Sequence, residues 1–144
     1  MKAERLDRAD LGSLKHALNE AALPSTDIGE PGRTFFRFSD KGQEIGFGGL
    51  EGSGPDLLLR SVVVAFNKRG QGLGGRLLAA LESEAVAIGG RRLHLLTNTA
   101  APFFARHGYE RQGRETAPAS IAGSAEFTRL CPASALYLVK RMPA

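Results

Sequence analysis

Apolar positions along the chain form short runs in some stretches and recur every three to four residues in others. Helical spacing predicts a helix from Asp7 or Asp10 to about Ala22, a long helix over residues 73–88 and a short one over 101–107. Runs and alternating stretches predict strands over residues 1–6, 34–39, 44–51, 57–64, 92–96 and 135–140, with another starting at Tyr109. Residues 118–130 are expected to be irregular or weakly helical. This order predicts a single α/β domain over residues 1–144, with helices on the faces of a mixed sheet.

The run over residues 57–64 is apolar except for Arg60 and Ser61, which predicts a central strand buried on both faces. Strand alternation places Ser61 on the opposite side from Arg60, where it either binds substrate or packs. A buried arginine is costly unless it is paired. We therefore expect Arg60 either to clamp the carboxylate of an amino-acid-like substrate or to form an internal ion pair with Glu51 or Glu44.

A basic, glycine-rich loop follows this strand and opens the long helix, with the sequence Arg69-Gly70-Gln71-Gly72-Leu73-Gly74-Gly75-Arg76. Glycines allow close backbone approach, and the N–H groups of a helix's first turn attract anions. The loop therefore predicts a phosphate or pyrophosphate site. A dinucleotide motif would need an acidic residue after the next strand, and a P-loop would need Ser or Thr where Leu77 stands.

The same loop resembles the pyrophosphate-binding signature of the GCN5-related N-acetyltransferase (GNAT) family, Arg/Gln-x-x-Gly-x-Gly/Ala. A second family segment follows the next strand, Thr97-x-x-Ala100-x-x-Phe103-Phe104-x-x-x-Gly108-Tyr109. The resemblance implies the GNAT fold, with six or seven strands that splay between strands 4 and 5 and about four flanking helices. It also implies direct acetyl transfer from acetyl-CoA to the primary amine of a small molecule.

The resemblance further implies where acetyl-CoA and the reacting groups lie. A backbone amide at Val63 would polarise the thioester carbonyl, and the pantetheine amides would pair with Val62 and Val64. Glu51 is a candidate water-linked general base, and Ser61 is a further candidate catalytic residue. The other cofactor-binding positions are expected to be Arg69, Gly70, Gln71, Gly72, Leu73, Gly74, Gly75, Arg76, Thr97, Ala101, Phe103 and Phe104.

Two positions depart from the family pattern. Phe104 stands where many members carry the tyrosine that protonates the departing thiolate, and Thr97 stands where many carry asparagine. The enzyme therefore needs a different acid, or the thiolate leaves unassisted. The alternative function is a non-catalytic CoA-binding or regulatory domain that kept the phosphate site and lost its acid.

Four other side chains are candidates with competing structural interpretations. His94 is either a base or a structural histidine within a strand, and His107 is expected to be a favourable cation at a helix C-terminus. Arg114 is a second candidate ligand for a substrate carboxylate. Cys131 is either a nucleophile, an arsenic ligand or, as we favour, a small core residue.

The last third of the chain has a narrower resemblance, to a subgroup of arsenic-resistance N-acetyltransferases. It rests on the run from Phe103 to Tyr109, on Glu126-Phe127 and on the run from Leu130 to Ala135. The resemblance implies an arsenic-containing or phosphinate amino acid as the acceptor.

The composition of the chain argues against several other classes of protein. The 144 residues include one cysteine, so neither a disulfide framework nor a metal site is expected. The net charge is +4, but the scattered arginines and the absence of Trp argue against nucleic-acid binding. No apolar run approaches the about 20 residues that span a bilayer, and the polar N-terminus does not resemble a signal peptide. We expect a cytoplasmic protein that does not bind membranes, and the family resemblance implies a homodimer.

Overall fold

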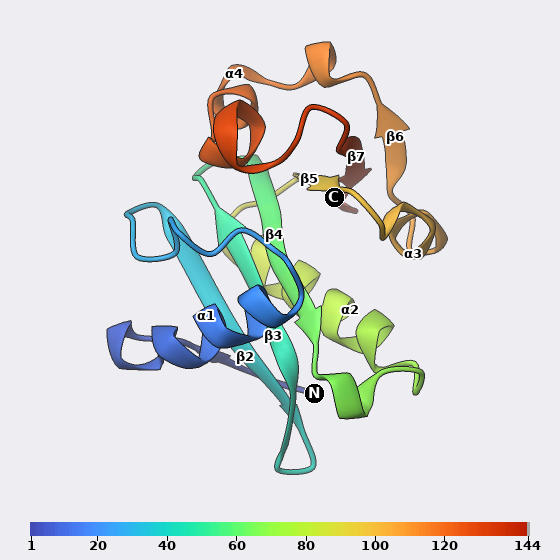
Figure 1. Ribbon diagram of the computed structural model, residues 1–144. Coiled ribbons are helices and arrows are strands. Elements are labelled where there is room, and N and C mark those ends of the chain that lie inside the picture. The colour runs from blue at the N-terminus through green and yellow to red at the C-terminus, as the bar shows by residue number, and fades with distance from the viewer. Residues whose placement is uncertain (144) are drawn as a thin grey trace.

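A seven-stranded sheet forms the centre of the computed structural model, which describes residues 1–143 (Figure 1). Its order is β1-β2-β3-β4-β5-β7-β6, and neighbouring strands are antiparallel except for β4 and β5. The predicted mixed sheet is confirmed, with each predicted strand present. The strands are β1 (Lys2–Arg5), β2 (Arg33–Asp40), β3 (Gln43–Glu51), β4 (Asp56–Val64), β5 (Arg92–Thr97), β6 (Glu110–Gln112) and β7 (Leu136–Arg141).

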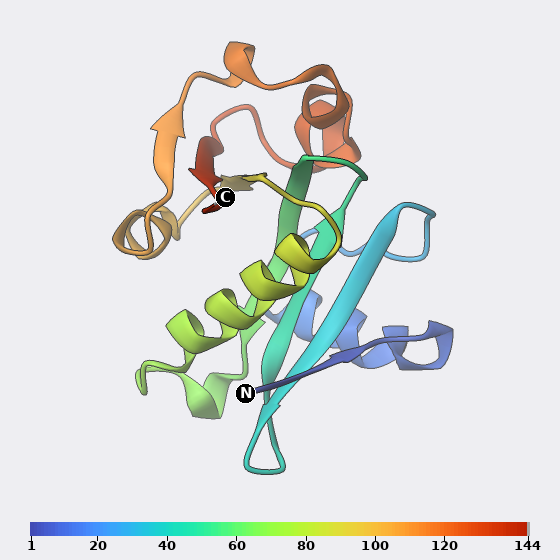
Figure 2. The ribbon, with the colours of Figure 1, turned by 180° about the vertical axis from the view of Figure 1, so that it is seen from behind.

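Helices cover both faces of the sheet. The α1 helix lies on the face seen in Figure 1, and α2 crosses the opposite face (Figure 2). No helix within residues 1–143 has the length and apolar character needed to cross a membrane. The helices are α1 (Leu11–Glu20), α2 (Leu73–Ala87), α3 (Ala101–Arg106) and α4 (Ala119–Ala122), with short turns η1 (Arg8–Asp10), η2 (Phe66–Lys68), η3 (Arg114–Thr116) and the π-helical η4 (Glu126–Leu130).

Each face of the sheet packs into its own apolar core, as the buried positions of the helices require. Leu14 and Leu18 of α1 are fully buried against the sheet, in a core with Phe35, Phe47 and Val63. The spacing of four residues places the two leucines on one side of the helix. The α2 side has the larger core, which includes Leu57, Leu59, Leu77, Leu78, Leu81 and Leu93.

The parallel pair β4 and β5 separates after a short contact. Asp56, Leu57 and Leu58 pair with Arg92, Leu93 and His94. Beyond Leu58, the described part of β5 offers no partner to β4, although β4 continues to Val64. The expected splay between strands 4 and 5 is therefore present, and it leaves one edge of the second half of β4 open.

A β-bulge at Ser61 lies at the start of this open edge. Phe47 of β3 pairs with Val63, but Gly49 pairs with Arg60, so Ser61 and Val62 together face the single residue between them on β3. Ser61 has φ 59°, in the left-handed region that is uncommon for a residue with a side chain. The extra residue shifts the alternation of side chains, so that Arg60 and Val63 both lie on the α1 side of the sheet.

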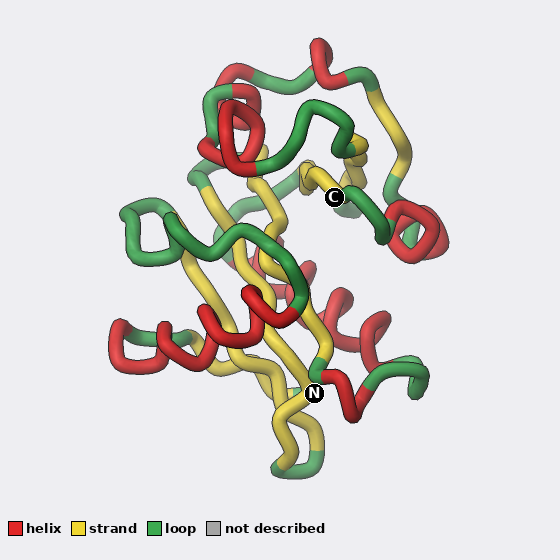
Figure 3. The backbone as a smooth tube through the Cα atoms, in the orientation of Figure 1, coloured by secondary structure: helices red, strands yellow, loops and turns green. Residues whose placement is uncertain are grey.

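The segment between β6 and β7 crosses the splay. Figure 3 shows that it arcs over the end of the sheet where β3 turns into β4. Its α4 packs on β4, with Ile121 buried, while Phe127 of η4 places its ring 5.3 Å from that of Tyr137 on β7. This segment therefore connects the two separated halves of the sheet.

A test of the close approach of β3 and β4 is the substitution Gly46→Ala. Gly46 pairs with Val64, and a Cβ there would collide with the carbonyl oxygen of Val63. Since backbone atoms cannot move aside as a flexible side chain does, we expect a loss of about 3 kcal/mol in the free energy of unfolding, measured with urea. The control Gly12→Ala places its Cβ in open space on α1. It should stabilise the protein by about 0.5–1 kcal/mol, and equal losses in the two variants would contradict the packing described.

Candidate functional site

The loop from β4 into α2 has an open backbone at two glycines. Gly70 and Gly72 have φ 79° and 73°, and no described heavy atom lies within 4 Å of the place where a Cβ would stand on either. Gly72 begins α2, which has no side-chain cap and no acidic residue in its first turn. The first N–H groups of α2 therefore remain available to an anion, as the sequence predicts.

The next two glycines serve packing. A Cβ on Gly74 would lie 3.2 Å from the ring of Phe103, and one on Gly75 would lie 2.8 Å from the ring of His107. Both aromatic side chains belong to the α3 region, so small residues here let α3 approach the start of α2. His107 ends α3, as expected, and its ring packs on Phe103 with the centroids 4.8 Å apart.

The basic side chains around the loop already have hydrogen-bond partners within the protein. Arg76, which the sequence suggests as a phosphate ligand, donates two hydrogen bonds to Asp40 at 2.9 and 3.1 Å. The Nε of Arg69 donates to the carbonyl of Val64 at 3.1 Å, and Lys68 donates to Gln43. Leu73 is half-buried, and Gln71 donates to the carbonyl of Asn67. The loop thus keeps a basic rim that is braced against β2 and β3.

The family segment at the start of α3 has mainly structural contacts in the described chain. The hydroxyl of Thr97 accepts a hydrogen bond from the amide of Ala100 at 3.0 Å, which caps the turn into α3. Phe104 is buried in the α2-side core, while Phe103 and Ala101 lie partly buried at its edge. The ring of Phe104 meets that of Tyr109 edge-on, and the Tyr109 hydroxyl donates to Glu82 at 2.9 Å.

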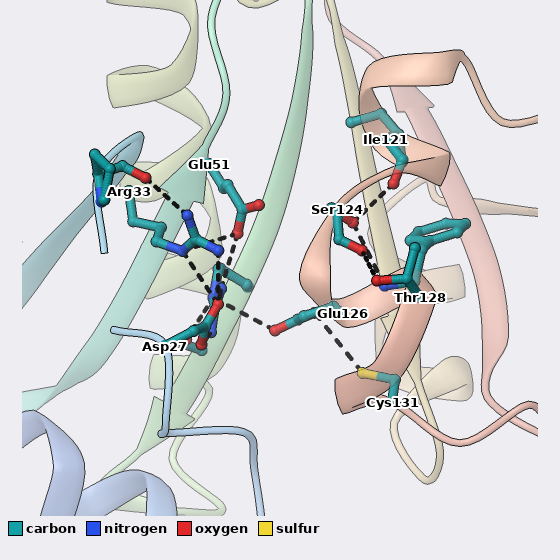
Figure 4. A network of polar contacts seen from close by, with 12 residues as sticks. Asp27, Arg33, Glu51, Ile121, Ser124, Glu126, Thr128 and Cys131 are labelled. Carbon is teal, nitrogen blue, oxygen red and sulfur yellow. Dashed lines mark hydrogen bonds and ion pairs between the residues drawn. The ribbon is translucent and has the colours of Figure 1, made fainter. Parts of the chain in front are cut away.

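A buried ionic network surrounds Arg60 on the other face of the splay, and Figure 4 shows it from close by. Arg60 donates to both oxygens of Asp27 at 2.6 Å and to Glu51 at 2.8 Å, and its Nε lies 3.4 Å from Glu126. Arg33 also binds Asp27, at 3.0 Å, and lies 3.6 Å from Glu51. These five residues are called the Arg60 cluster below. The guanidinium itself lies against the ring of Phe35 and is fully buried.

The Arg60 cluster decides between the two interpretations of Arg60. The expected ion pair with Glu51 is present, whereas Glu44 binds Arg37 instead. All three guanidinium nitrogens of Arg60 already contact internal acceptors, so we assign it no substrate carboxylate. Ser61 does not point away from Arg60 as alternation suggested: because of the bulge, its hydroxyl accepts from the Arg60 Nε at 3.3 Å.

Two carboxyl groups of the Arg60 cluster, those of Asp27 and Glu126, have pKa values shifted in opposite directions. Burial opposes ionisation of Asp27, but the hydrogen bonds from Arg60 and Arg33 outweigh it and lower the pKa of that carboxyl. Burial raises the pKa of Glu126 to about 7; Arg60 lowers it only in part, and the nearby charges of Asp27 and Glu51 raise it further. Glu126 therefore exchanges a proton near neutral pH.

Cys131 is the hydrogen-bond partner of Glu126. Its thiol donates to Glu126 Oε1 at 3.8 Å, and burial beside that carboxylate raises the pKa of the thiol to about 12. A thiol that stays protonated is a poor nucleophile. Half-buried Cys131 thus fits the favoured interpretation of a small packing residue.

His94 belongs to a second buried chain of hydrogen bonds at the apex of the splay. Its Nε2 lies 2.8 Å from Asp56 and its Nδ1 lies 2.7 Å from the hydroxyl of Tyr137. Burial lowers the pKa of His94 despite Asp56, while hydrogen bonds from His94 and Arg92 outweigh burial and lower the pKa of Asp56. Ionised Asp56 therefore accepts from Nε2–H, and the tyrosine hydroxyl donates to Nδ1. This arrangement supports a structural histidine.

Arg114 holds the segment between β6 and β7 together. It donates to the carbonyl oxygens of Pro132 and Ala135 at 3.2 and 3.3 Å, and to that of Phe127 at 3.0 Å. Its guanidinium also lies over the Phe127 ring. These contacts give Arg114 a bracing role within the segment, and its expected binding of a substrate carboxylate stays a prediction.

Sequence reasoning missed Asp27 and Glu126 as members of the site. Asp27 lies in the loop between α1 and β2, and Glu126 lies in the stretch that the sequence predicts to be irregular or weakly helical and that contains α4 and η4. The one available signal was Arg60 itself, since a buried guanidinium requires buried acids. That signal says that partners exist but does not say which acids of the chain they are.

Comparison with known proteins identifies a family whose sequence profile matches this chain. The profile of the acetyltransferase (GNAT) domain matches residues 31–111. N-alpha-acetyltransferase 80 of Mus musculus is 50% identical over 54 residues, which are 38% of this chain and 17% of that protein. The chain therefore matches only a small part of that relative.

Solved structures share the fold at low sequence identity. Rv2747 of Mycobacterium tuberculosis, in complex with CoA, superposes with TM-score 0.77 at 20% identity over 99% of this chain and 100% of that one. N-acetylglutamate synthase of Neisseria gonorrhoeae, with coenzyme A and L-arginine, gives TM-score 0.77 at 17% identity over 99% of this chain and 33% of that one. The aminoglycoside 6'-N-acetyltransferase of Enterococcus faecium gives TM-score 0.69 at 17% identity over 100% and 99%.

The burial of Arg60 predicts a large loss of stability when it is removed. Arg60→Leu leaves three carboxyl groups facing one another, so we expect the free energy of unfolding at pH 7.5 to fall by about 3–5 kcal/mol. Arg92→Leu breaks an ion pair to Asp56 at a side chain that is 44% exposed, and it should cost less than about 1 kcal/mol. Urea denaturation measures both, and similar losses would contradict a dominant role for the Arg60 cluster.

The raised pKa of Glu126 predicts how stability varies with pH. Its pKa is about 7 in the folded protein and near the ordinary 4.5 in the unfolded chain. Between these values the folded state binds more protons, so the free energy of unfolding falls as the pH rises from 4.5 through 7. Glu126→Gln removes this loss. Between pH 5 and pH 8, its free energy of unfolding should therefore rise relative to that of the parent by about 2–3 kcal/mol. The exposed control Glu115→Gln should track the parent, and parallel curves for Glu126→Gln would refute the assignment.

Proposed function

The chain belongs to the acetyltransferase (GNAT) family, and from that premise we propose that it transfers the acetyl group of acetyl-CoA directly to the primary amine of a small molecule. The observation that carries the proposal is the open edge of β4, which leads into the open glycine loop at the start of α2. An extended ligand that ends in a pyrophosphate fits such a path. Its extended part pairs with the strand edge, and its pyrophosphate meets the first turn of the helix.

The residues present fit acetyl-CoA at each position of that path. Val62 and Val64 are on the open edge of β4, and both side chains pack toward the α2 side, where the loop lies. Gly70 and Gly72 provide room for a phosphate. The Neisseria and Mycobacterium structures of the same fold contain coenzyme A, which supports the same cosubstrate here. When bound, acetyl-CoA supplies an activated acetyl thioester.

The bulge at Ser61 supports a catalytic role for the backbone that follows it. A register shift turns backbone groups away from their ladder partners, and Val63 is the residue at which β4 resumes pairing with β3 after the bulge. We assign its amide to the thioester carbonyl, where a fixed donor stabilises the developing oxyanion. Ser61 helps to hold Arg60 in this arrangement, and Glu51 is a candidate base whose carboxylate also binds Arg60.

The departing thiolate needs no tyrosine at position 104. A thiol with a pKa near 8.5 leaves far more readily than an amine does, so unassisted departure is compatible with the buried ring of Phe104. Both tyrosines of the chain, Tyr109 and Tyr137, have internal partners, Glu82 and His94. The alternative of a non-catalytic CoA-binding domain rests on Phe104 alone, and turnover decides it.

The finer identity of the acceptor remains a prediction. An amino-acid-like acceptor was expected because Arg60 or Arg114 would bind its carboxylate, yet both side chains have internal partners. An arsenic-containing acceptor rests on the resemblance of the last third alone. Homodimer formation and a cytoplasmic location likewise stay predictions.

Calorimetry and a thiol-release assay test the proposed function together. We expect acetyl-CoA to bind at micromolar concentration and CoA thiol to appear with at least one amine of a panel. The panel contains alkylamines, aminoglycosides, amino acids and arsenic-containing amino acids. Binding without turnover on every amine favours the non-catalytic alternative, and absence of binding sinks both.

The glycine loop predicts a selective loss of acetyl-CoA affinity. Gly72→Val forces a β-branched residue into a φ of 73° and fills the open space that we assign to phosphate. We expect the dissociation constant for acetyl-CoA to rise by about tenfold or more, since several anion contacts are lost. Gly89→Val imposes a similar φ, 99°, at the far end of α2, also in open space. Gly89→Val should raise the dissociation constant by less than about twofold. Equal increases in the two variants would argue against phosphate binding at the glycine loop.

A further inference from the structure

We propose that Glu126 takes the proton from the ammonium group of the acceptor, and that the Arg60 cluster recognises the acceptor as a cation. The inference rests on the proposed function and assigns the role of base to Glu126 in place of the candidate Glu51, which accepts a 2.8 Å hydrogen bond from Arg60. Most primary amines are protonated at neutral pH, with about 0.1% of a lysine-like amine in the neutral form. A group that removes this proton beside the thioester therefore accelerates the reaction.

Glu126 lies beside the bulge that we place at the reaction centre. Its Oε2 is 3.4 Å from the Nε of Arg60, and that same Nε is 3.3 Å from the hydroxyl of Ser61. Figure 4 shows Glu126 extending from η4 across the splay toward β4. The side chain thus approaches β4 immediately before Val62 to Val64, from the face opposite the α2 side.

Glu126 is the least satisfied acid of the cluster. The Oδ2 atom of Asp27 alone accepts hydrogen bonds from three guanidinium nitrogens of Arg60 and Arg33, each within 3.1 Å. Glu51 accepts one hydrogen bond from Arg60, at 2.8 Å. Glu126 has the longer ionic contact with Arg60 and the 3.8 Å hydrogen bond from Cys131, a weak donor. A carboxylate with few strong donors gains most from a new ammonium partner or from a proton.

Charge in the cluster favours a cationic acceptor. Three carboxyl groups (Asp27, Glu51 and Glu126) face two guanidinium groups (Arg33 and Arg60), so full ionisation leaves one excess negative charge in a buried place. Arg114 is outside the cluster and donates to backbone carbonyl groups. One ammonium group neutralises the excess, whereas an acceptor with a carboxylate near its amine brings no net charge and places a further carboxylate beside the three of the cluster.

The protonation behaviour agrees with this geometry. With a pKa of about 7, Glu126 is divided between its two forms at neutral pH. A base works best when its pKa lies near the working pH, because it is then available yet still basic. The ammonium group of the acceptor stabilises the charged form and lowers that pKa on binding.

Acetyl transfer with Glu126 as the base conserves atoms and charge. Glu126 carboxylate takes one proton from the acceptor's –NH₃⁺, and the amine lone pair forms the new C–N bond at the thioester carbonyl. The tetrahedral carbon then expels the thiolate as the C–S bond breaks. The thiolate receives the second nitrogen proton to become CoA thiol, and Glu126 returns its proton to water. The sum converts ammonium and thioester into amide, thiol and one proton.

The pH dependence of kcat/KM tests the assignment on an alkylamine that turns over in the panel. The parent should gain activity as the pH rises through about 7, where Glu126 ionises. Glu126→Gln should lose about 100-fold in kcat/KM at pH 7.5 and should lack this limb. The exposed control Glu115→Gln should keep the kcat/KM of the parent at pH 7.5 and its rise in activity through about pH 7. The circular dichroism spectrum and the acetyl-CoA dissociation constant should be the same in the parent and in both variants.

A paired acceptor separates a base from a structural residue. The β,β-difluoro analogue of the same alkylamine has a much less basic nitrogen that is largely neutral at pH 7.5. Glu126→Gln should reduce its transfer less than about threefold, because no base is needed. Equal losses with both acceptors, or an unchanged pH limb in Glu126→Gln, overturn this inference and leave the proposed function standing. Failure of the parent to acetylate any amine overturns both.

Carbon-13 NMR of the glutamate carboxyls gives a readout without turnover. The Glu126 resonance, identified by its absence in Glu126→Gln, should titrate near pH 7 in the ligand-free protein. Propylammonium should lower its midpoint and propionate should not. A midpoint near 4.5, or no response to propylammonium, contradicts recognition of a cation by the Arg60 cluster.

Discussion

The extra residue in β4 at Ser61 is the constraint on which both halves of the site depend. Up to Leu58, β4 pairs with β5, and from Leu59 through the bulge to Val64 its described partners are on β3 alone. The bulge also places Arg60 and Val63 on one face while Val62 and Val64 lie on the other. A single insertion in one strand therefore separates a face for an ionic cluster from an open edge for an extended cosubstrate.

Arg60 joins segments that the sheet does not connect. Its partners come from the loop before β2, from the end of β3 and from η4 between β6 and β7. A buried guanidinium without these acids would be unstable, so the cluster forms only when all three segments are in place. Stability and the geometry of the proposed acceptor side are consequently coupled through Arg60, and Glu126 is the member with a pKa near neutrality.

The two hydrogen-bonded chains at the splay have different characters. Asp56, His94 and Tyr137 satisfy one another where β4 and β5 separate, and the lowered pKa of the histidine keeps that chain neutral at its centre. The Arg60 cluster is charged and contains one carboxyl with weak partners. Buried polar networks tend toward rigidity when every group is satisfied. Reactivity is therefore expected at Glu126 and rigidity at His94.

The sequence by itself determined the elements, the central strand and the anion loop, because these depend on local periodicity and on glycines within a few residues of one another. Tertiary structure alone decided the partners of Arg60, since Asp27 lies 33 positions away and Glu126 lies in a segment without clear periodicity. It also turned Ser61 toward Arg60 and tied Arg76 to Asp40. Contacts between distant segments depend on how the sheet twists and where it bulges, and no spacing in the chain records that.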